Sequence, residues 1–304
     1  MIKNFFRVLF NKERLFYALA YRGFWRFLDD ETFLKMAFRF LMGYRLDINR
    51  VETYNEKLQW LKLHNREPLH TKLVDKYLVK EYVSEIIGHE YIIPTLNVYN
   101  CVDEIDLSSL PEKFVLKTNH NSGGIVICNN KSELDWSYAK HKLSLAYNYN
   151  FYYSLREWPY KDVDRKIIAE QYIEDAKSGS LHDYKFYCFD GEPKVLLIAT
   201  ERNNKTSETK FDFFDMDFNH LDFRRGHPNS DIKIDKPCSF EKMKELARKL
   251  SQGHIHVRVD LYEVDGKVYF GELTFYPGSG LVPFEPMDWD YKMGSWINIP
   301  NLKK

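Results

Sequence analysis

Residues 254–280 have the sequence HIHVRVDLYEVDGKVYFGELTFYPGSG, and the rest of the chain is organised around them. Apolar and polar residues alternate over 257–261, and a second run extends over 267–275, after the turn residues Asp265 and Gly266. Alternation with a period of two on both sides of an Asp-Gly pair is typical of two antiparallel strands joined by a tight turn. The stretch therefore predicts a β-hairpin.

The length of the turn decides which side chains share a face, because a slip of one residue moves every side chain to the opposite face. A two-residue turn, Asp265-Gly266, places Glu272 opposite Val259 and away from the face of Asp260. A three-residue turn that begins at Val264, with Gly266 in the left-handed conformation, is the arrangement that we expect for a functional hairpin. It brings four polar side chains onto one face: Arg258, Asp260, Glu272 and Thr274.

Two carboxylates and a hydroxyl on one face suggest a metal site. Asp260 and Glu272 would repel each other unless a divalent cation lay between them, and hard oxygen ligands of this kind suit Mg²⁺ with bound phosphate. The alternative is an amphipathic surface hairpin with a cross-strand Arg-Glu pair.

Composition excludes some functions. The 304 residues are 44% hydrophobic and 16% aromatic, enough for a full core in two or three lobes. Lys+Arg and Asp+Glu balance at 44 each, so no global field favours nucleic acid as a partner. The cysteines are far apart and form no CxxC pair, which argues against a zinc site or a disulfide scaffold: Cys101, Cys128, Cys188 and Cys238. We expect a reducing cytoplasm, with no signal peptide and no membrane-spanning stretch.

The first 45 residues are rich in Phe, Leu, Tyr and Arg and contain few acids. Apolar residues at helical spacing with basic residues between them predict helices. Such helices pack on their own domain or lie on an anionic membrane surface, and the sequence leaves the role of residues 1–45 open.

Residues 113–128 form a second informative stretch. They predict a strand that ends near Lys117, a polar loop containing Gly123 and Gly124, and another strand. Backbone N–H groups freed by the glycines can surround phosphate oxygens, while Lys117 supplies a positive charge. An ordinary hairpin is the alternative.

The remaining elements follow from periodicity and turn residues. We expect helices over 53–64, 71–87, 132–158 and 239–252. We expect extended segments over 91–99, at a sheet edge, and over 166–175, with a hairpin over 183–200. Residues 202–235 predict a polar, irregular loop, which is either a substrate loop or simply solvated.

In this order, the elements resemble the ATP-grasp superfamily and, within it, the group named after the teichuronopeptide biosynthesis protein TupA, with matching stretches from about Tyr54 to Pro286. The resemblance implies an α+β fold in which two lobes clasp ATP, with an N-terminal helical segment. We predict a helical, basic and aromatic segment over 1–70, a helix and strand over 71–111, a small lobe over 112–175, and a C-terminal lobe with the metal hairpin over 176–304.

The resemblance also assigns roles to residues. Lys76 and Lys117 match lysines that contact nucleotide phosphates, Asp183 could reach the ribose, and Lys185 could reach the phosphates. The loop Asn121, Ser122, Gly123 and Gly124 matches the mobile phosphate loop, and three residues fall where adenine is hydrogen-bonded: Glu170, Gln171 and Ile173.

The expected metal ligands are Asp260, Glu272 and Thr274. Thr274 stands where most of the superfamily has Asn, which leaves the number of Mg²⁺ ions open. Lys117, Lys185 and Arg258 are the predicted catalytic residues, since their charges would oppose that of the transferring phosphoryl group.

The implied function is an ADP-forming carboxylate-amine ligase of cell-surface polysaccharide biosynthesis. It would join an amino acid to a uronic or related acid, carried on a glycan or nucleotide sugar, through an acyl phosphate. The alternatives are a phosphotransferase acting on a sugar hydroxyl, a glycosyltransferase-pathway accessory protein and a non-catalytic nucleotide-binding partner. We expect a cytoplasmic protein with peripheral contact to the inner membrane surface as an option. The sequence leaves open both substrates, the oligomeric state and whether the acceptor is lipid-linked.

Overall fold

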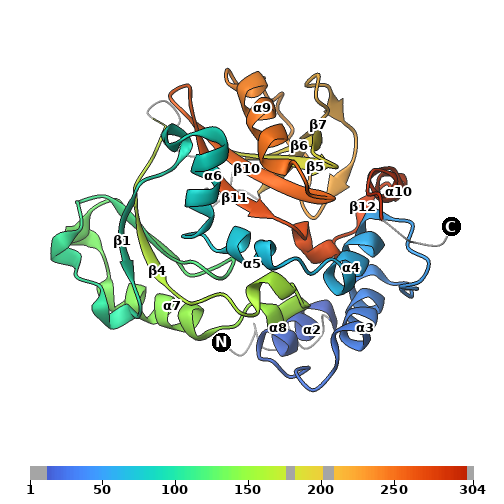
Figure 1. The fold of residues 1–304 in the computed structure, drawn as a ribbon, viewed down its shortest axis with the longest axis horizontal. Helices are drawn as coiled ribbons and strands as arrows, with labels where there is room; N and C mark the ends of the chain where they lie inside the picture. Colours follow the sequence, from blue (N-terminus) through green and yellow to red (C-terminus); the bar gives the residue numbers. More distant parts are fainter. Residues whose placement is uncertain (1–11, 176–181, 201–208, 300–304) are drawn as a thin grey trace.

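The computed structural model describes residues 12–175, 182–200 and 209–299 (Figure 1). Over these residues the chain forms two large antiparallel sheets, a third sheet of only two strands, and a set of helices. The α+β class predicted from the sequence is confirmed. Each large sheet has its own apolar core, and the two cores share no residue.

The smaller sheet has the strand order β1-β4-β2-β3. Its strands are β1 (Thr95–Tyr99), β2 (Phe114–Thr118), β3 (Ile125–Cys128) and β4 (Ile167–Gln171). Residues Phe114 and Leu116 are fully buried on one face beside α7 (Trp136–Asn148), whereas Val115 and Lys117 are partly exposed on the other. This alternation turns one face of the sheet toward the second lobe.

The larger sheet has the strand order β11-β10-β5-β6-β7-β8. Its strands are β5 (His182–Phe189), β6 (Glu192–Thr200), β7 (Lys210–Phe214), β8 (His220–Leu221), β10 (His256–Val264) and β11 (Lys267–Thr274). The helix α9 (Phe240–Ser251) packs on it. The prediction of an irregular loop over 202–235 is wrong for the residues that the structure describes, since this segment contains β7, β8 and β9 (Arg224–Arg225). Strand β9 pairs with β12 (Phe284–Glu285).

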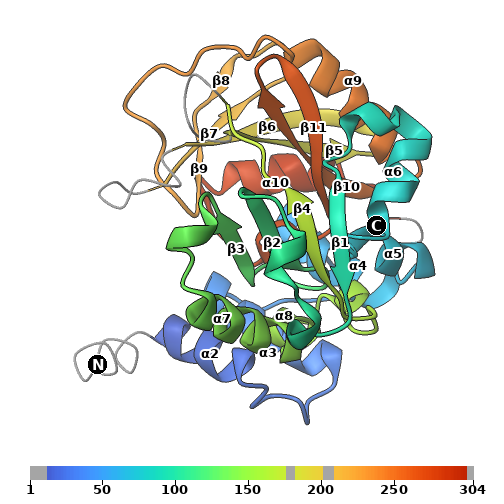
Figure 2. The ribbon, with the colours of Figure 1, turned by 90° about the vertical axis from the view of Figure 1, so that its left-hand side faces the viewer.

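Other helices lie around and below the sheets (Figures 1 and 2). They are α2 (Lys12–Tyr21), α3 (Asp30–Met42), α4 (Tyr54–His64), α5 (Pro68–Val74), α6 (Val79–Ile87), α8 (Tyr152–Leu155) and α10 (Asp288–Ser295). The single helix predicted over 132–158 is instead α7 followed by the single turn of α8. No helix in the described ranges is long and apolar enough to cross a bilayer.

The helix predicted over 71–87 is also divided. Asp75 has extended backbone angles, and its side chain accepts hydrogen bonds from the backbone N–H groups of Tyr77 and Leu78 at 2.8 and 3.2 Å. Aspartate favours such a local turn over a continuous helix. The break leaves the backbone N–H of Lys76 free to bond the carbonyl of Asn119 at 3.1 Å, which places Lys76 between the lobes.

The register of the β10–β11 hairpin differs from the expected one. Val264 pairs with Lys267, so the turn contains only Asp265 and Gly266, both at positive φ, and the three-residue turn is wrong. The register then shifts by one residue between Asp260 and Leu261, where Gly271 is an extra residue on β11. This bulge restores the shared face that the shorter turn alone would have removed.

Candidate active site

The four polar side chains of the hairpin meet on one face. Asp260 lies directly opposite Glu272, and Arg258 lies directly opposite Thr274. Arg258 donates to both oxygens of Asp260 at 2.6 Å, to Glu272 at 3.3 Å and to the Thr274 hydroxyl at 3.1 Å. Directly opposed residues on antiparallel strands point to the same side, so the two carboxylates converge as the metal hypothesis requires.

The carboxylates are held by positive charges rather than left to repel each other, which corrects the electrostatic argument from the sequence. Asp260 is almost fully buried, and Lys185 on β5 contacts it through Nζ at 2.5 Å. The same ammonium lies 3.5 Å from Asp183. Burial acts to raise the pKa of Glu272, but the surrounding cations, Lys76 first among them, outweigh burial and lower the pKa to about 2. Glu272 is therefore available as an anion.

The donor set fits Mg²⁺ only together with phosphate. No group of three or more His, Cys, Asp or Glu side chains in the described part of the chain could hold a metal ion. Asp260 and Glu272 supply two hard carboxylates and Thr274 adds a hydroxyl, but Arg258 and Lys185 already neutralise Asp260. A bare divalent ion would add uncompensated charge, whereas an ion that arrives with phosphate brings its own compensation. These three residues would hold the ion, which would neutralise phosphate charge.

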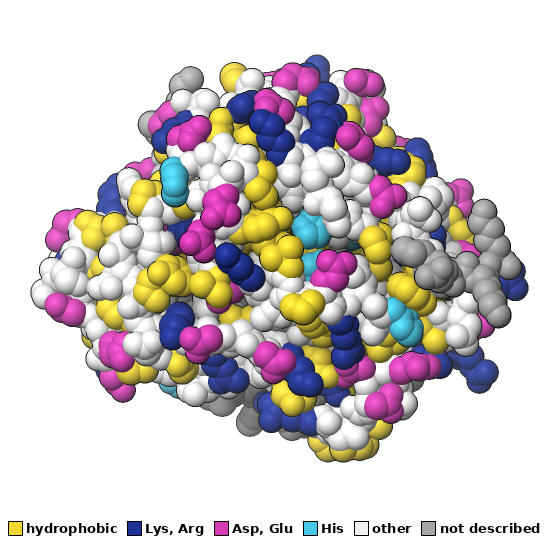
Figure 3. Space-filling view, in the orientation of Figure 1, with side chains coloured by type: hydrophobic (Ala, Val, Ile, Leu, Met, Phe, Trp, Pro, Cys, Tyr) yellow, Lys and Arg dark blue, Asp and Glu magenta, His cyan; other side chains and the backbone are white. Residues whose placement is uncertain are grey.

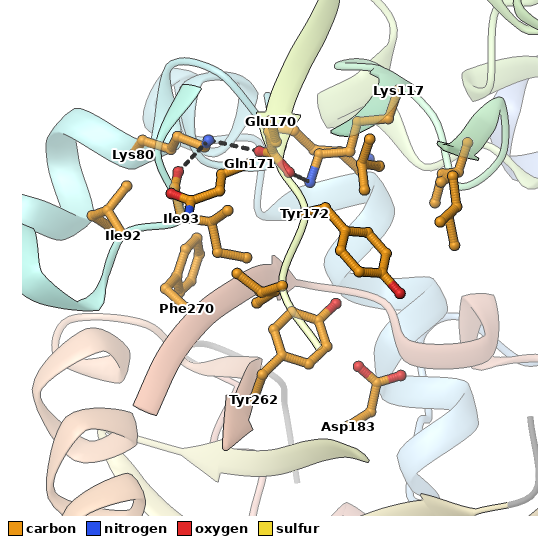
Figure 4. A pocket seen from close by; sticks show the side chains of 16 residues that line it. Lys80, Ile92, Ile93, Lys117, Glu170, Gln171, Tyr172, Asp183, Tyr262 and Phe270 are labelled. Carbon is orange, nitrogen blue, oxygen red and sulfur yellow. Dashed lines mark hydrogen bonds and ion pairs between the residues drawn. The ribbon is translucent and has the colours of Figure 1, made fainter. Parts of the chain in front are cut away.

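A cavity of about 320 Å³ lies between the lobes, beside the hairpin (Figure 4). Its lining comes from both sheets and from α6 and the segment that follows it. The lining residues are Lys76, Lys80, Ile92, Ile93, Val115, Lys117, Ile125, Ile127, Glu170, Gln171, Tyr172, Ile173, Asp183, Tyr262, Phe270 and Gly271. Apolar walls with a few convergent charges are typical of small-molecule sites.

Glu170 is the buried centre of this cavity's polar wall. Lys80 and Lys117 contact its two oxygens at 2.6 and 2.5 Å, as the dashed lines in Figure 4 mark. Burial acts to raise the pKa of Glu170, but the two lysines outweigh it, so that the pKa lies below its ordinary value. Lys80 also donates to the carbonyl of Ile93 and the hydroxyl of Thr95 at 2.8 and 2.7 Å. This fixes the segment before β1 against β4.

Most of the predicted nucleotide residues line the cavity. Lys76, Lys117, Glu170, Gln171, Ile173 and Asp183 belong to it, and Lys185 lies next to Asp183. The lining does not include the predicted phosphate loop Asn121, Ser122, Gly123 and Gly124, which touches the site through Lys76. The Lys76 ammonium donates to the carbonyl of Asn121 at 2.5 Å.

Lys80 and the apolar walls were missed by the sequence analysis. The available signal for Lys80 was its position four residues after Lys76, but its partner Glu170 is distant in sequence. Ile125 and Ile127 were assigned only to a strand, yet they are exposed on β3 and line the cavity. Exposed isoleucines on a sheet face beside charged groups mark an apolar surface that a planar ligand could cover.

The loop between β2 and β3 is fixed by hydrogen bonds of one of its own side chains, that of Asn121. The Asn121 side chain accepts from the Thr118 hydroxyl at 2.8 Å and from the Gly123 N–H at 3.0 Å, and it donates to the carbonyl of Ala146 at 2.8 Å. This side chain therefore shapes the loop, in which Ser122 and Gly123 are exposed and Gly124 is half-buried. Gly124 has a φ of +62° beside Ala146.

Replacing Gly124 by alanine should destabilise the protein by about 2 to 4 kcal/mol, since strain and overpacking add. The new Cβ would lie 2.3 Å from the Cβ of Ala146, in a backbone conformation that alanine rarely adopts. Gly123→Ala is the matched control, because the nearest atom to its Cβ would be 4.0 Å away. Urea unfolding of both variants measures the difference, and equal stabilities would contradict the packing that we describe.

Comparison with known proteins adds a family. A family model described as TupA-like ATPgrasp matches residues 56–298. A search of curated proteins found no match. Solved structures similar to this chain include D-alanine–D-alanine ligase from Helicobacter pylori, with 16% identity over 80% of this chain and 65% of that chain and a TM-score of 0.45. The same ligase from Bacillus anthracis complexed with ATP has 16% identity over 67% and 53%, with a TM-score of 0.39. The ATP-grasp ligase PsnB complexed with minimal precursor, Mg and ADP has 10% identity over 72% and 57%, with a TM-score of 0.40. The chain thus spans between 53% and 65% of the length of these proteins.

Proposed function

The chain belongs to the TupA-like ATP-grasp family, and we propose that it is an ADP-forming ligase that joins a carboxylate to an amine through an acyl phosphate. The observation that carries the proposal is the adjacency of two sites. A cavity with apolar walls and lysines lies directly beside a hairpin on which two carboxylates face each other. Adenosine would occupy the apolar part of the cavity, and its phosphates would extend toward the hairpin.

The residues divide into three groups by what they can do. Ile93, Ile125 and Phe270 offer apolar contact to adenine, and the backbone of Gln171 and Ile173 offers it hydrogen bonds. Lys76 and Lys117 supply charge for the phosphates from two different segments. Glu170 holds Lys117 at 2.5 Å, so the lysine is positioned before a nucleotide arrives.

The reaction needs charge neutralisation more than covalent help from the protein. An oxygen of the acid substrate attacks the γ-phosphorus, and ADP leaves. The amine nitrogen then attacks the acyl carbon, phosphate leaves and the nitrogen loses a proton. Arg258 and Lys185, which both contact Asp260, would oppose the negative charge on the transferring group. Asp260, Glu272 and Thr274 would hold Mg²⁺, which would supply further positive charge.

For the substrates, we propose an amino acid as the amine and a uronic or related acid of a cell-surface glycan as the carboxylate. The family assignment supports this pairing through the teichuronopeptide pathway named above.

Trapping with hydroxylamine tests the reaction class. Purified protein, ATP, Mg²⁺ and nucleotide-linked uronic acids should yield a hydroxamate and ADP, and only when ATP and the acid are both present. A phosphorylated sugar without hydroxamate would assign the protein to the phosphotransferases. Release of AMP in place of ADP would contradict an acyl phosphate.

Replacing Lys117 by methionine should weaken ATP binding by about 1 to 3 kcal/mol, the loss expected for a charge-assisted contact to phosphate. Adenosine binding should barely change, because Lys80 still holds Glu170. Lys113→Met is the control, since Lys113 is exposed and pairs with Glu174. Calorimetric titration compares the two ligands, and equal losses for both would mean that Lys117 supports the fold instead of the phosphates.

A further inference from the structure

The N-terminal helices expose an unusual number of large aromatic side chains. We use the term aromatic face for Tyr17, Tyr21, Phe24, Phe27 and Phe40, which come from α2, from α3 and from the turn between them. Phe27 is 74% exposed, Phe24 57% and Phe40 50%. Single exposed aromatic residues are common on soluble proteins, but three rings that are at least half exposed on adjoining elements, Phe24, Phe27 and Phe40, call for a partner.

The exposed phenylalanine rings belong to one contiguous cluster, whereas Tyr21 stacks on Tyr149 at a centroid distance of 3.9 Å. The buried Phe16 stacks on Phe40 at 5.4 Å and on Trp25 at 6.0 Å. Trp25 contacts Phe24 at 4.8 Å and Phe27 at 6.5 Å. The outer rings therefore rest on an ordered aromatic layer and form a surface of one piece.

The turn that presents these rings is anchored to the body of the protein. The buried Arg156 donates to the carbonyls of Trp25 and Leu28 at 2.9 and 3.2 Å and forms an ion pair with Asp30 at 3.2 Å. Phe24 and Phe27 thus point outward from a fixed backbone, so little conformational entropy is lost when they are buried by a partner.

Exposed arginines lie around the aromatic face. Arg22 and Arg39 are exposed, and neither forms an ion pair with any residue that the structure describes. Two nearby carboxylates are already neutralised, since Asp30 pairs with Arg66 at 2.5 Å and Glu31 pairs with Lys35 at 2.5 Å. A third, the exposed Asp29, accepts from the backbone N–H of Thr32 at 2.9 Å at the start of α3. At the lower edge of Figure 3, over α2 and α3, hydrophobic, basic and acidic side chains lie next to each other.

We propose that the aromatic face docks the protein on a lipid bilayer that contains anionic lipids. Tyr rings prefer the depth of the headgroups, Phe rings enter the boundary between headgroups and acyl chains, and exposed arginines are attracted to anionic phosphates. A face that combines exposed rings with exposed arginines therefore matches both the apolar and the anionic part of such a surface. This inference is independent of the proposed reaction.

Vesicle co-sedimentation of the full chain tests the proposal. Protein should sediment with vesicles made of equal parts phosphatidylcholine and phosphatidylglycerol, and far less with phosphatidylcholine alone. Phe24→Ser/Phe27→Ser should lower the partition coefficient roughly 10-fold or more, because two apolar rings no longer enter the interface. Ile232→Ser is the matched control, since Ile232 is 73% exposed outside this face. Arg22→Gln/Arg39→Gln should reduce binding and its dependence on salt.

Three outcomes would overturn the proposal. The first is wild-type protein that stays in the supernatant with both vesicles, and the second is an Ile232→Ser loss as large as that of the double Phe variant. The third is concentration-dependent self-association in the ultracentrifuge that the Phe substitutions abolish while vesicles remain unbound, because the aromatic face would then bind a second copy. Unchanged melting temperatures of the variants establish that lost binding does not reflect lost folding.

Discussion

Replacing Glu272 by glutamine should lower ATP turnover by at least about 100-fold. The substitution removes a carboxylate that would hold Mg²⁺, and the charge of the ion is needed while negative charge moves between the phosphates. Glutamine keeps the size of the side chain and an oxygen that can accept from Arg258 and Thr274, which lie 3.3 and 3.2 Å from the present carboxylate. The substitution therefore removes the charge while it leaves the contacts. Initial rates at saturating ATP and Mg²⁺ measure the effect.

The same substitution should change stability by no more than about 1 kcal/mol, since the Glu272 side chain is 39% exposed and its ion pair is screened by solvent. Glu263→Gln, on the neighbouring strand, is the control, because glutamine there still accepts from the backbone N–H of Ser239. The control should retain its turnover. A Glu272→Gln variant with near-normal turnover would remove the metal hypothesis, and a large loss of stability would assign Glu272 to the fold.

The hairpin shows how far its sequence could be interpreted. The alternation and the Asp265-Gly266 turn predicted two strands, and the shared face of Asp260 and Glu272 is present. The predicted register was wrong, since a two-residue turn and a bulge at Gly271 replace the three-residue turn. A glycine within a strand is a recognised sign of a bulge. An added Cβ at Gly271 would lie 3.0 Å from the carbonyl oxygen of Asp260, so the close approach of the two strands favours glycine there.

The polar wall of the cavity was less predictable, because the residues that form it are distant in sequence and are brought together only by the tertiary fold. Lys117 was identified from its strand and loop, but nothing local indicates that Glu170 holds it together with Lys80. The break at Asp75 had a local signal in the preference of aspartate for helix starts, yet the apolar periodicity continues across it. Periodicity reports which face is buried and does not report where one helix ends.

Acidification from pH 7 to pH 5.5 should lower the free energy of unfolding by at least about 3 kcal/mol. Four buried histidines are responsible: His70, His120, His254 and His256. Burial lowers the pKa of His70 and His256 to about 3 and that of His120 to about 4, and it lowers the pKa of His254 as well.

The sign follows from proton uptake. Below about pH 6.5 the unfolded chain protonates these imidazoles, whereas the folded protein keeps them neutral, so the unfolded state binds more protons and gains stability as the pH falls. His70, His120 and His256 each contribute about 1 kcal/mol over this interval, and His254 acts in the same direction. Urea unfolding at the two pH values measures the sum.

His254 offers the sharpest test of this account, because neither of its ring nitrogens has a hydrogen-bond partner among the described residues. Replacement by leucine removes the titrating group without breaking a hydrogen bond, so the pH dependence of stability should become smaller. The exposed His141 is the control, and His141→Gln should leave the dependence unchanged. A His254→Leu variant with the full pH dependence would mean that this imidazole is protonated in the folded protein. The loss of free energy of unfolding at pH 5.5 would then arise from other titrating groups.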